Sequence, residues 1–196
     1  RWVDRVRVGG STLIEKIGSQ SGLAYRVPVQ GFSQDSEFMD LSLWTRPSAS
    51  GGGQVATYQG NFKKNQSIPL PKNVDELEII NRAFEGIPGG MYREGATGVW
   101  SGGFMLAVPI SAALGTATTD VAVVHIQSER FQATFKKDGP LRSALTDAKG
   151  NFLAVSEGYL EARQGRYYGG PQALGIAGLQ VNLLAPREEI EVSWWQ

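Results

Sequence analysis

Short hydrophobic stretches, separated by glycine and proline, run along most of the chain and predict many strands and few helices. Residues 37–44 alternate imperfectly between hydrophobic and polar side chains, as a half-buried strand would. The small residues at 48–53 then predict a hairpin loop, and a second strand follows over residues 54–59. Residues 121–126 are nearly all apolar, which is typical of a central strand covered on both faces.

Helical spacing predicts one clear helix, over residues 74–84, with Asn73 as its N-cap. Its apolar face consists of Leu77, Ile80, Ala83 and Phe84. Its charged residues are expected to face elsewhere, namely Asp75, Glu76, Glu78 and Arg82. Near the N-terminus, the spacing of Thr12 and Glu15 matches a capping box and predicts a short helix that ends near Gly18.

The rest of the chain continues as strands joined by tight loops. The expected strands cover residues 104–110, 120–127, 141–146, 151–155 and 178–185. Ser128 can cap a short helix that carries Phe131 and Phe135 on one face, and Pro186 can begin a terminal helix. A turn over residues 147–150 joins two of the strands, and its glycine supplies a positive φ angle. We therefore expect an α+β domain with a mainly antiparallel central sheet and flanking helices.

Composition narrows the classes of function. The chain of 196 residues fits a single domain, and 41% of its residues are hydrophobic, enough for a core of ordinary size. Nineteen Lys and Arg residues balance nineteen Asp and Glu residues, so no basic face predicts binding to nucleic acid. Cysteine is absent, which removes disulfides, thiolate chemistry and cysteine-based zinc sites. No stretch approaches the roughly 18 consecutive apolar residues of a membrane-spanning helix.

The sequence offers little catalytic chemistry, because its one histidine, His125, lies in the most apolar predicted strand. A zinc site needs three or four ligands, and no cysteine or second histidine can join His125. The Gly-x-Ser-x-Gly elbow and the Walker and Gly-x-Gly-x-x-Gly phosphate loops are missing. A hydrolase with paired carboxylates stays open, but no spacing selects a pair. We expect no catalytic residue, metal or cofactor, and interpret His125 as a core or pocket-lining side chain with one hydrogen-bond partner.

The strongest candidate for a binding site is an aromatic cluster around one arginine. It consists of Tyr92, Arg93, Trp100 and Phe104, with His125 as a further ligand-binding residue. Aromatic rings beside a forked guanidinium suit a pocket for a small anion or carboxylate, so Arg93 is the first choice for a ligand contact. The alternative is that Tyr92 and Arg93 lie on an exposed edge strand while Trp100 closes the core.

Tryptophan lies near both ends of the chain, at Trp2 and at Trp194 and Trp195. Tryptophan and basic residues concentrate at membrane–water interfaces, which suits a domain held between two spanning helices. Ordinary packing, or contacts between two copies of the chain, would explain the same residues.

Residues 38–190 resemble the Cache family of extracellular, PAS-like sensor domains. The segments that carry the resemblance are Phe104–Ile110, Thr119–Ile126, Glu129–Phe131, Leu145–Leu153 and Leu183–Pro186. The resemblance implies a PAS/Cache-like sensor domain over residues 38–186. A helical or irregular segment over residues 1–37 would precede it, and a helix over residues 187–196 would lead toward the membrane.

A narrower resemblance is to the sensor regions of spirochaete-type membrane adenylate/guanylate cyclases. It rests on Asp35–Phe38, Leu43–Trp44 and Asn81–Gly86. It implies a periplasmic or extracellular domain, tethered to the membrane, whose ligand state reaches a cytoplasmic cyclase.

Two features depart from the Cache pattern. Family members usually begin with a long helix, but glycine costs about 1 kcal/mol at each interior helix position, so a long straight helix is not expected here. The glycines concerned are Gly9, Gly10, Gly18 and Gly22. The amino-acid-binding members also combine Tyr, Arg, Trp and a downstream Tyr and Asp at fixed spacing, which Tyr92 and Trp100 do not reproduce. The resemblance therefore implies an unknown small molecule as the ligand.

Together, these features predict a sensor domain without catalytic activity, in which ligand binding shifts an equilibrium between two states. The alternative is a ligand-free dimerisation or scaffold domain of a membrane receptor. A homodimer is compatible with both.

Overall fold

The structure is a computed structural model that describes residues 2–19, 37–46, 56–61, 68–95, 102–110, 115–127, 129, 132–133, 141–164, 167–173 and 176–186. The helices of this part are α1 (Trp2–Ser19), α2 (Val74–Phe84) and α4 (Tyr159–Arg163). The strands of its first half are β1 (Phe38–Thr45), β2 (Ala56–Asn61), β3 (Gly89–Glu94), β4 (Gly102–Pro109) and β5 (Asp120–Gln127). Those of its second half are β6 (Arg142–Asp147), β7 (Phe152–Val155), β8 (Tyr167–Ala173) and β9 (Leu179–Pro186).

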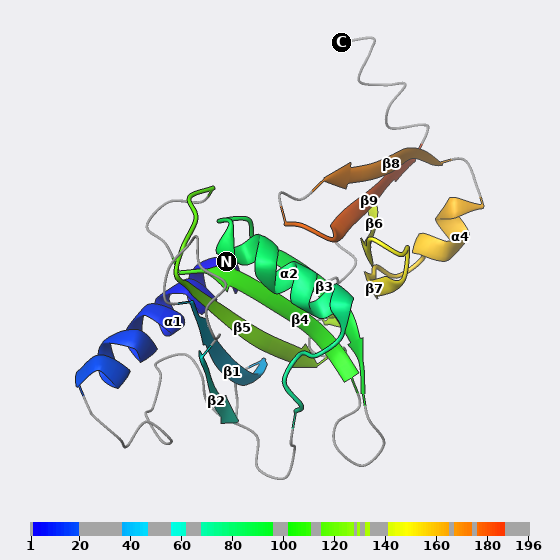
Figure 1. Cartoon of the computed structure of the whole chain (residues 1–196). Coiled ribbons are helices and arrows are strands. Elements are labelled where there is room, and N and C mark those ends of the chain that lie inside the picture. The colour runs from blue at the N-terminus through cyan, green and yellow to red at the C-terminus, as the bar shows by residue number, and fades with distance from the viewer. Residues whose placement is uncertain are drawn as a thin grey trace.

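The described strands form two antiparallel sheets (Figure 1). The first sheet has the order β2-β1-β5-β4-β3, and every neighbouring pair in it is antiparallel. The second sheet has the order β7-β6-β9-β8 and is also antiparallel throughout. The predicted helix over residues 74–84 and the predicted strand over residues 120–127 correspond to α2 and β5.

Helices α1 and α2 cover opposite faces of the first sheet. Successive side chains of a strand point to opposite faces. In β4, Leu106 packs in one buried cluster with Val6 of α1, whereas its neighbour Met105 packs in another cluster with Ile80 of α2. Figure 1 shows α2 lying across the near face of this sheet. The first sheet is therefore the middle layer between two helices.

The second sheet is joined to the first by a shared core and by the edge strand β3. Leu145 and Leu179 of the second sheet belong to the same buried cluster as Leu106. At the start of β3, the Gly90 N–H donates to the Ala177 carbonyl at 2.9 Å. The Ala177 N–H donates in turn to the Pro88 carbonyl at 2.7 Å, so the backbone of β3 contacts the segment that leads into β9.

The N-terminal helix is longer than the sequence predicts, because α1 continues through Gly9 and Gly10, both of which are buried. A Cβ atom on Gly10 would lie 2.5 Å from Ile110 Cδ1 and 3.1 Å from Ala122 Cβ. Glycine thus allows the helix to approach the sheet closely. Packing of the buried helix face outweighs a propensity cost of about 1 kcal/mol for each glycine. The expectation of a short helix was wrong.

Three other expectations, about the burial of β1, the orientation of α2 and the role of Pro186, are wrong. Strand β1 is buried on both faces and is not half-buried. In the helix α2, Leu77 is 36% exposed while Glu76 is buried, the reverse of the expected orientation. Pro186 is the last residue of β9 and pairs with Tyr167, so it does not begin a helix.

The elements α4 and β8 were not predicted, and β3 was expected only in the alternative that places Tyr92 and Arg93 on an edge strand. Three expected features lie outside the described residues: the loop over 48–53, the face formed by Phe131 and Phe135, and the helix over 187–196. Within the described ranges, no helix combines the length and the apolar character that crossing a membrane requires.

Candidate functional site

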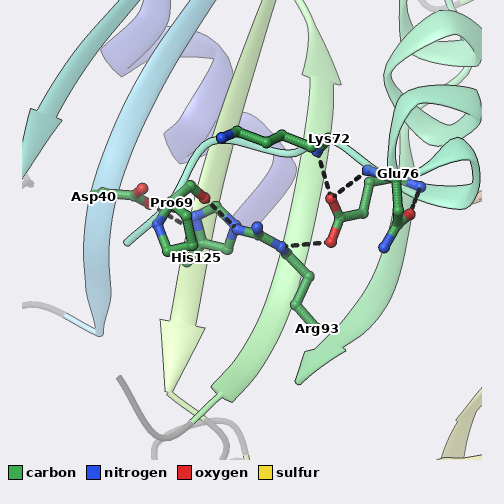
Figure 2. Close-up of polar contacts among 7 residues, drawn as sticks. Asp40, Pro69, Lys72, Glu76, Arg93 and His125 are labelled. Atoms are coloured by element: carbon green, nitrogen blue, oxygen red, sulfur yellow. Dashed lines mark hydrogen bonds and ion pairs between the residues drawn. The ribbon is translucent and has the colours of Figure 1, made fainter. Parts of the chain in front are cut away.

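Polar side chains from three strands and from α2 meet on the face of the first sheet that lies beneath α2. Asp40 of β1 lies opposite His125 of β5 in the strand register, and Arg93 comes from the edge strand β3. Figure 2 shows these side chains pointing toward one another, with Glu76 from the first turn of α2 completing the row. Asp40 and His125 are each 1% exposed, Arg93 is 7% exposed and Glu76 is 6% exposed. We call these four residues the buried network.

Hydrogen bonds connect the buried network from end to end. Asp40 Oδ1 lies 2.7 Å from His125 Nδ1 and accepts from the His125 backbone N–H at 2.9 Å. On the other side of the ring, His125 Nε2 lies 2.8 Å from Arg93 Nη1. Arg93 Nε donates to Glu76 Oε1 at 2.8 Å, and Nη1 also donates to the Pro69 carbonyl at 2.8 Å (Figure 2).

The guanidinium group determines which nitrogen of His125 carries the proton. Arg93 has no acceptor atom, so Nε2 of His125 must accept the hydrogen bond from Nη1. The ring proton then lies on Nδ1 and is donated to Asp40. His125 therefore has a side-chain partner at each nitrogen, and the expectation of one partner is corrected. Because Arg93 occupies the lone pair of Nε2, His125 cannot act as a general base in this arrangement.

Glu76 joins the buried network to the N-terminus of α2. Its backbone N–H donates to the Asn73 side chain at 2.8 Å, and its Oε2 accepts from the backbone N–H of Asn73 at 3.2 Å and of Lys72 at 2.7 Å. These contacts form a capping box. Burial alone would raise the pKa of Glu76. The hydrogen bonds from Lys72, Arg93 and Asn73, together with the charge of Arg93, outweigh burial and lower the pKa below its usual 4.5.

The buried network holds secondary-structure elements in place. It connects β1, β5 and β3 to the first turn of α2 and anchors the carbonyl of Pro69 in the segment before that helix. Removing one member of a buried ion pair leaves the other charge uncompensated, so each member depends on its neighbour. In the part of the chain that the structure describes, no group of three or more His, Asp or Glu side chains could hold a metal ion.

The residues predicted to form one pocket lie on both faces of the sheet. Arg93 and His125 meet beneath α2, whereas Tyr92 and Phe104 pair on the opposite face, in the cluster that packs against α1. Strand β3 is an edge strand, as the alternative interpretation supposed, but Arg93 is buried and not exposed. Trp100 lies outside the described residues.

Sequence reasoning missed the two carboxylates of the buried network. Glu76 stands three residues after Asn73, which is the spacing of a capping box, and that signal was present in the sequence. Asp40 is a single acid within an otherwise largely apolar strand. A charge that is buried on a strand needs a partner, and His125 was the other titratable residue in an apolar strand. The buried acid and the buried histidine together could have predicted the contact between Asp40 and His125.

No protein-family model matches the sequence, and no curated protein matches it significantly. Solved structures are similar in fold. The ligand-binding domain of the amino acid chemoreceptor PctB from Pseudomonas aeruginosa PAO1, in complex with L-Arg, has a TM-score of 0.50 at 10% identity, over 96% of this chain and 89% of that chain. The corresponding domain of the chemoreceptor CtaA from Pseudomonas fluorescens, in complex with L-isoleucine, has a TM-score of 0.49 at 12% identity, over 98% of this chain and 87% of that chain.

A third similar structure is the ligand-binding domain of the amino acid chemoreceptor PctC from Pseudomonas aeruginosa PAO1, in complex with GABA. It has a TM-score of 0.45 at 13% identity, over 90% of this chain and 88% of that chain. At such identities the likeness concerns the fold alone. The fold of this chain is similar to that of these ligand-binding domains, and the predicted α+β class with a mainly antiparallel sheet and flanking helices is confirmed.

Proposed function

We propose that the chain is the extracytoplasmic sensing domain of a membrane signalling protein, which binds a small ligand and transmits its state to a cytoplasmic output domain. The observation that carries this proposal is the position of strand β3. One end of β3 places Arg93 in the buried network, and the other end hydrogen-bonds to the segment that leads into β9. A movement of Arg93 would therefore shift β3 and, through it, the second sheet, which precedes residues 187–196.

The proposed ligand is a small molecule with a carboxylate, and Arg93 and His125 are its proposed contacts. The guanidinium of Arg93 is a forked donor that suits a carboxylate, and in this structure Glu76 supplies one. A ligand carboxylate would compete with Glu76 for the same donors. The release of Glu76 would loosen the first turn of α2, because Glu76 also caps that helix. The L-Arg that PctB binds carries such a carboxylate.

Tyr92, Phe104 and Trp100 enter the proposal differently. Tyr92 and Phe104 face α1 across the sheet, so they would respond to a ligand only through movement of β3 and β4. Trp100 follows β3 in the chain and is kept as a candidate contact for the ligand. A nucleotide cyclase is the proposed output, supported by the resemblance of Asn81–Gly86 and the other quoted segments to cyclase sensor regions.

A thermal-shift screen of small carboxylates, with the matching amides as neutral controls, tests the proposal. A ligand that binds only the folded state should raise Tm by mass action. Glu76→Gln should then bind the carboxylate more tightly than wild type, because the internal competitor has lost its charge. Arg93→Gln should lose binding, and Glu78→Gln, which alters an exposed acid on the same helix, should leave the affinity unchanged.

Two outcomes would contradict the proposal. Unchanged affinity in Arg93→Gln would show that the ligand binds elsewhere. If no compound raises Tm, and light scattering with native mass spectrometry shows a dimer without any ligand, the scaffold function would replace the sensing function.

A further inference from the structure

A concave site lies on the second sheet, on the face that points away from the shared core. It is a recess of about 400 Å³ that is lined by residues of the short helix α4 and of strands β6, β7, β8 and β9. Its lining includes Thr146, Phe152, Tyr159, Arg163, Gln180 and Asn182. A volume of this size lies within the range of small-molecule pockets, which is about 300–1,000 Å³.

The strand register shows that the recess and the shared core use opposite faces of this sheet. Thr146 pairs with Gln180, and both line the recess. Their neighbours Leu145 and Leu179 point the other way, into the cluster shared with the first sheet. The recess is thus separate from the buried network, which lies beneath α2 on the first sheet.

One buried polar group in the recess has no hydrogen-bond partner among the described residues. It belongs to Tyr159, which is only 4% exposed and lines the recess, while none of those residues bonds its hydroxyl group. Arg163 and Gln180 also line the recess, but their side chains are exposed to solvent. Asn182 uses its amide nitrogen for a contact of 3.4 Å with Thr146. A buried polar group without a partner is costly and calls for a bound water or ligand.

The charges of the lining indicate what kind of ligand fits. Among the described residues that line the recess, Arg163 is the one that carries a charge, and none is Asp or Glu. A single guanidinium with no competing carboxylate favours an anion and binds a carboxylate through two parallel hydrogen bonds. Phe152 and Tyr159 pack edge to face at 6.1 Å between ring centroids and give the recess one aromatic wall. The amide groups of Gln180 and Asn182 lie on β9, and the hydroxyl group of Thr146 lies on β6.

We propose that this recess is a second binding site, which takes a small organic monocarboxylate. Arg163 binds the carboxylate, Tyr159 donates its hydroxyl hydrogen to it, and Gln180 and Asn182 bind polar groups on the remainder of the molecule. The ligand would connect α4 to β9, the strand that immediately precedes residues 187–196. The site would give the chain an input that acts directly on the second sheet and does not pass through Arg93.

Isothermal titration calorimetry on the full chain tests this site. The probes are monocarboxylates of increasing size, from propionate to benzoate, with propionamide and benzamide as neutral controls. We expect at least one acid to bind and its amide to bind far more weakly. Arg163→Gln changes an exposed side chain. It should lower the affinity for the acid by about tenfold or more, as expected for the loss of a charge-assisted hydrogen bond. Tyr159→Phe keeps the ring packing and should lower the affinity for the acid by a smaller factor than Arg163→Gln does.

Matched variants separate this site from the one in the proposed function. Arg82→Gln removes an exposed arginine from α2 and should leave the affinity at the recess unchanged. If acids and amides bind equally, or if Arg163→Gln binds every acid as wild type does, the second site is ruled out. Loss of binding in Arg93→Gln with full binding in Arg163→Gln would rule out the second site alone. The reverse pattern would rule out the ligand site at Arg93 alone.

Discussion

Besides the Pro69 carbonyl, Arg93 contacts two side-chain acceptors of different kinds, a carboxylate from α2 and an imidazole from β5. A planar guanidinium can serve both, because its N–H groups diverge in a fixed fork. The geometry makes each partner depend on the others. Glu76 is the charged partner that the described residues offer Arg93, whereas the Pro69 carbonyl and the His125 ring are neutral acceptors.

Glu76→Gln tests this dependence. The variant keeps the shape of the side chain but removes the charge that faces Arg93, and breaking a buried ion pair typically costs about 3–5 kcal/mol. We expect a loss in the free energy of unfolding near the lower end of that range, measured by urea titration. The matched change Glu78→Gln, in an exposed pair with Arg82, should cost less than about 1 kcal/mol. Equal losses in the two variants would show that Glu76 has no special role.

The stabilisation by Glu76 should also depend on pH. The folded-state pKa of Glu76 is lowered from its usual 4.5, so ionisation of Glu76 favours the folded state. This contribution is fully present above the unfolded pKa and is lost as the pH falls through the lower folded value. The difference in unfolding free energy between wild type and Glu76→Gln should be constant above about pH 5.5 and should shrink below about pH 4. A difference that grows on acidification would contradict this sign.

The sequence pointed to Arg93 and His125 but not to the geometry that joins them. Residue type identified both, because an arginine among aromatics and the chain's one histidine are conspicuous. The side of the sheet each residue faces depends on strand register, which sets Met105 opposite His125 and Phe104 opposite Tyr92. The predicted cluster ignored that alternation, so it placed neighbours in sequence in one pocket.

At the scale of elements, the sequence predicts those that local signals determine better than those that depend on long-range packing. Helix α2 matches its predicted bounds because its N-cap, acidic first turn and apolar spacing all lie within the segment itself. Helix α1 does not match, because Gly10 suits the helix only through its close packing against Ile110 and Ala122, which the local sequence does not show. Strand β8 contains two glycines and a proline and forms by pairing with β9, which no local pattern in its own sequence indicates.

A double-mutant cycle on α1 tests the role of close packing. Gly10→Ala gains about 1 kcal/mol of helix propensity, but its Cβ would lie 2.5 Å from Ile110 Cδ1. Overpacking of this kind costs about 1–3 kcal/mol, so we expect a net loss of stability. Ile110→Val removes the Cδ1 atom, and Gly10→Ala should cost less in that background. If Gly10→Ala stabilises the chain in both backgrounds, glycine is not needed for the approach of α1 to the sheet.

At the scale of the whole molecule, the two sheets are joined by side chains as well as by the backbone. Leu145, Leu153 and Leu179 of the second sheet lie in one cluster with core residues of the first sheet and α1. The hydrogen bonds at Ala177 connect the same two parts along β3. The core is therefore continuous, so the two sheets should unfold together, and in the proposed function a ligand signal at β3 would reach the second sheet through this core.

Leu179→Ala tests this continuity. Leu179 is 6% exposed, and truncating a buried leucine typically costs about 2–5 kcal/mol. Because Leu179 packs in the shared cluster, we expect hydrogen exchange of the β4 and β5 amides, in the first sheet, to accelerate along with that of β6 and β9. The control Leu160→Ala, at a position on α4 that is 52% exposed, should change neither set. If only the amides of the second sheet lose protection, that sheet opens independently, and a route from Arg93 through β3 to the C-terminal segment would lack the mechanical connection on which the proposed sensing depends.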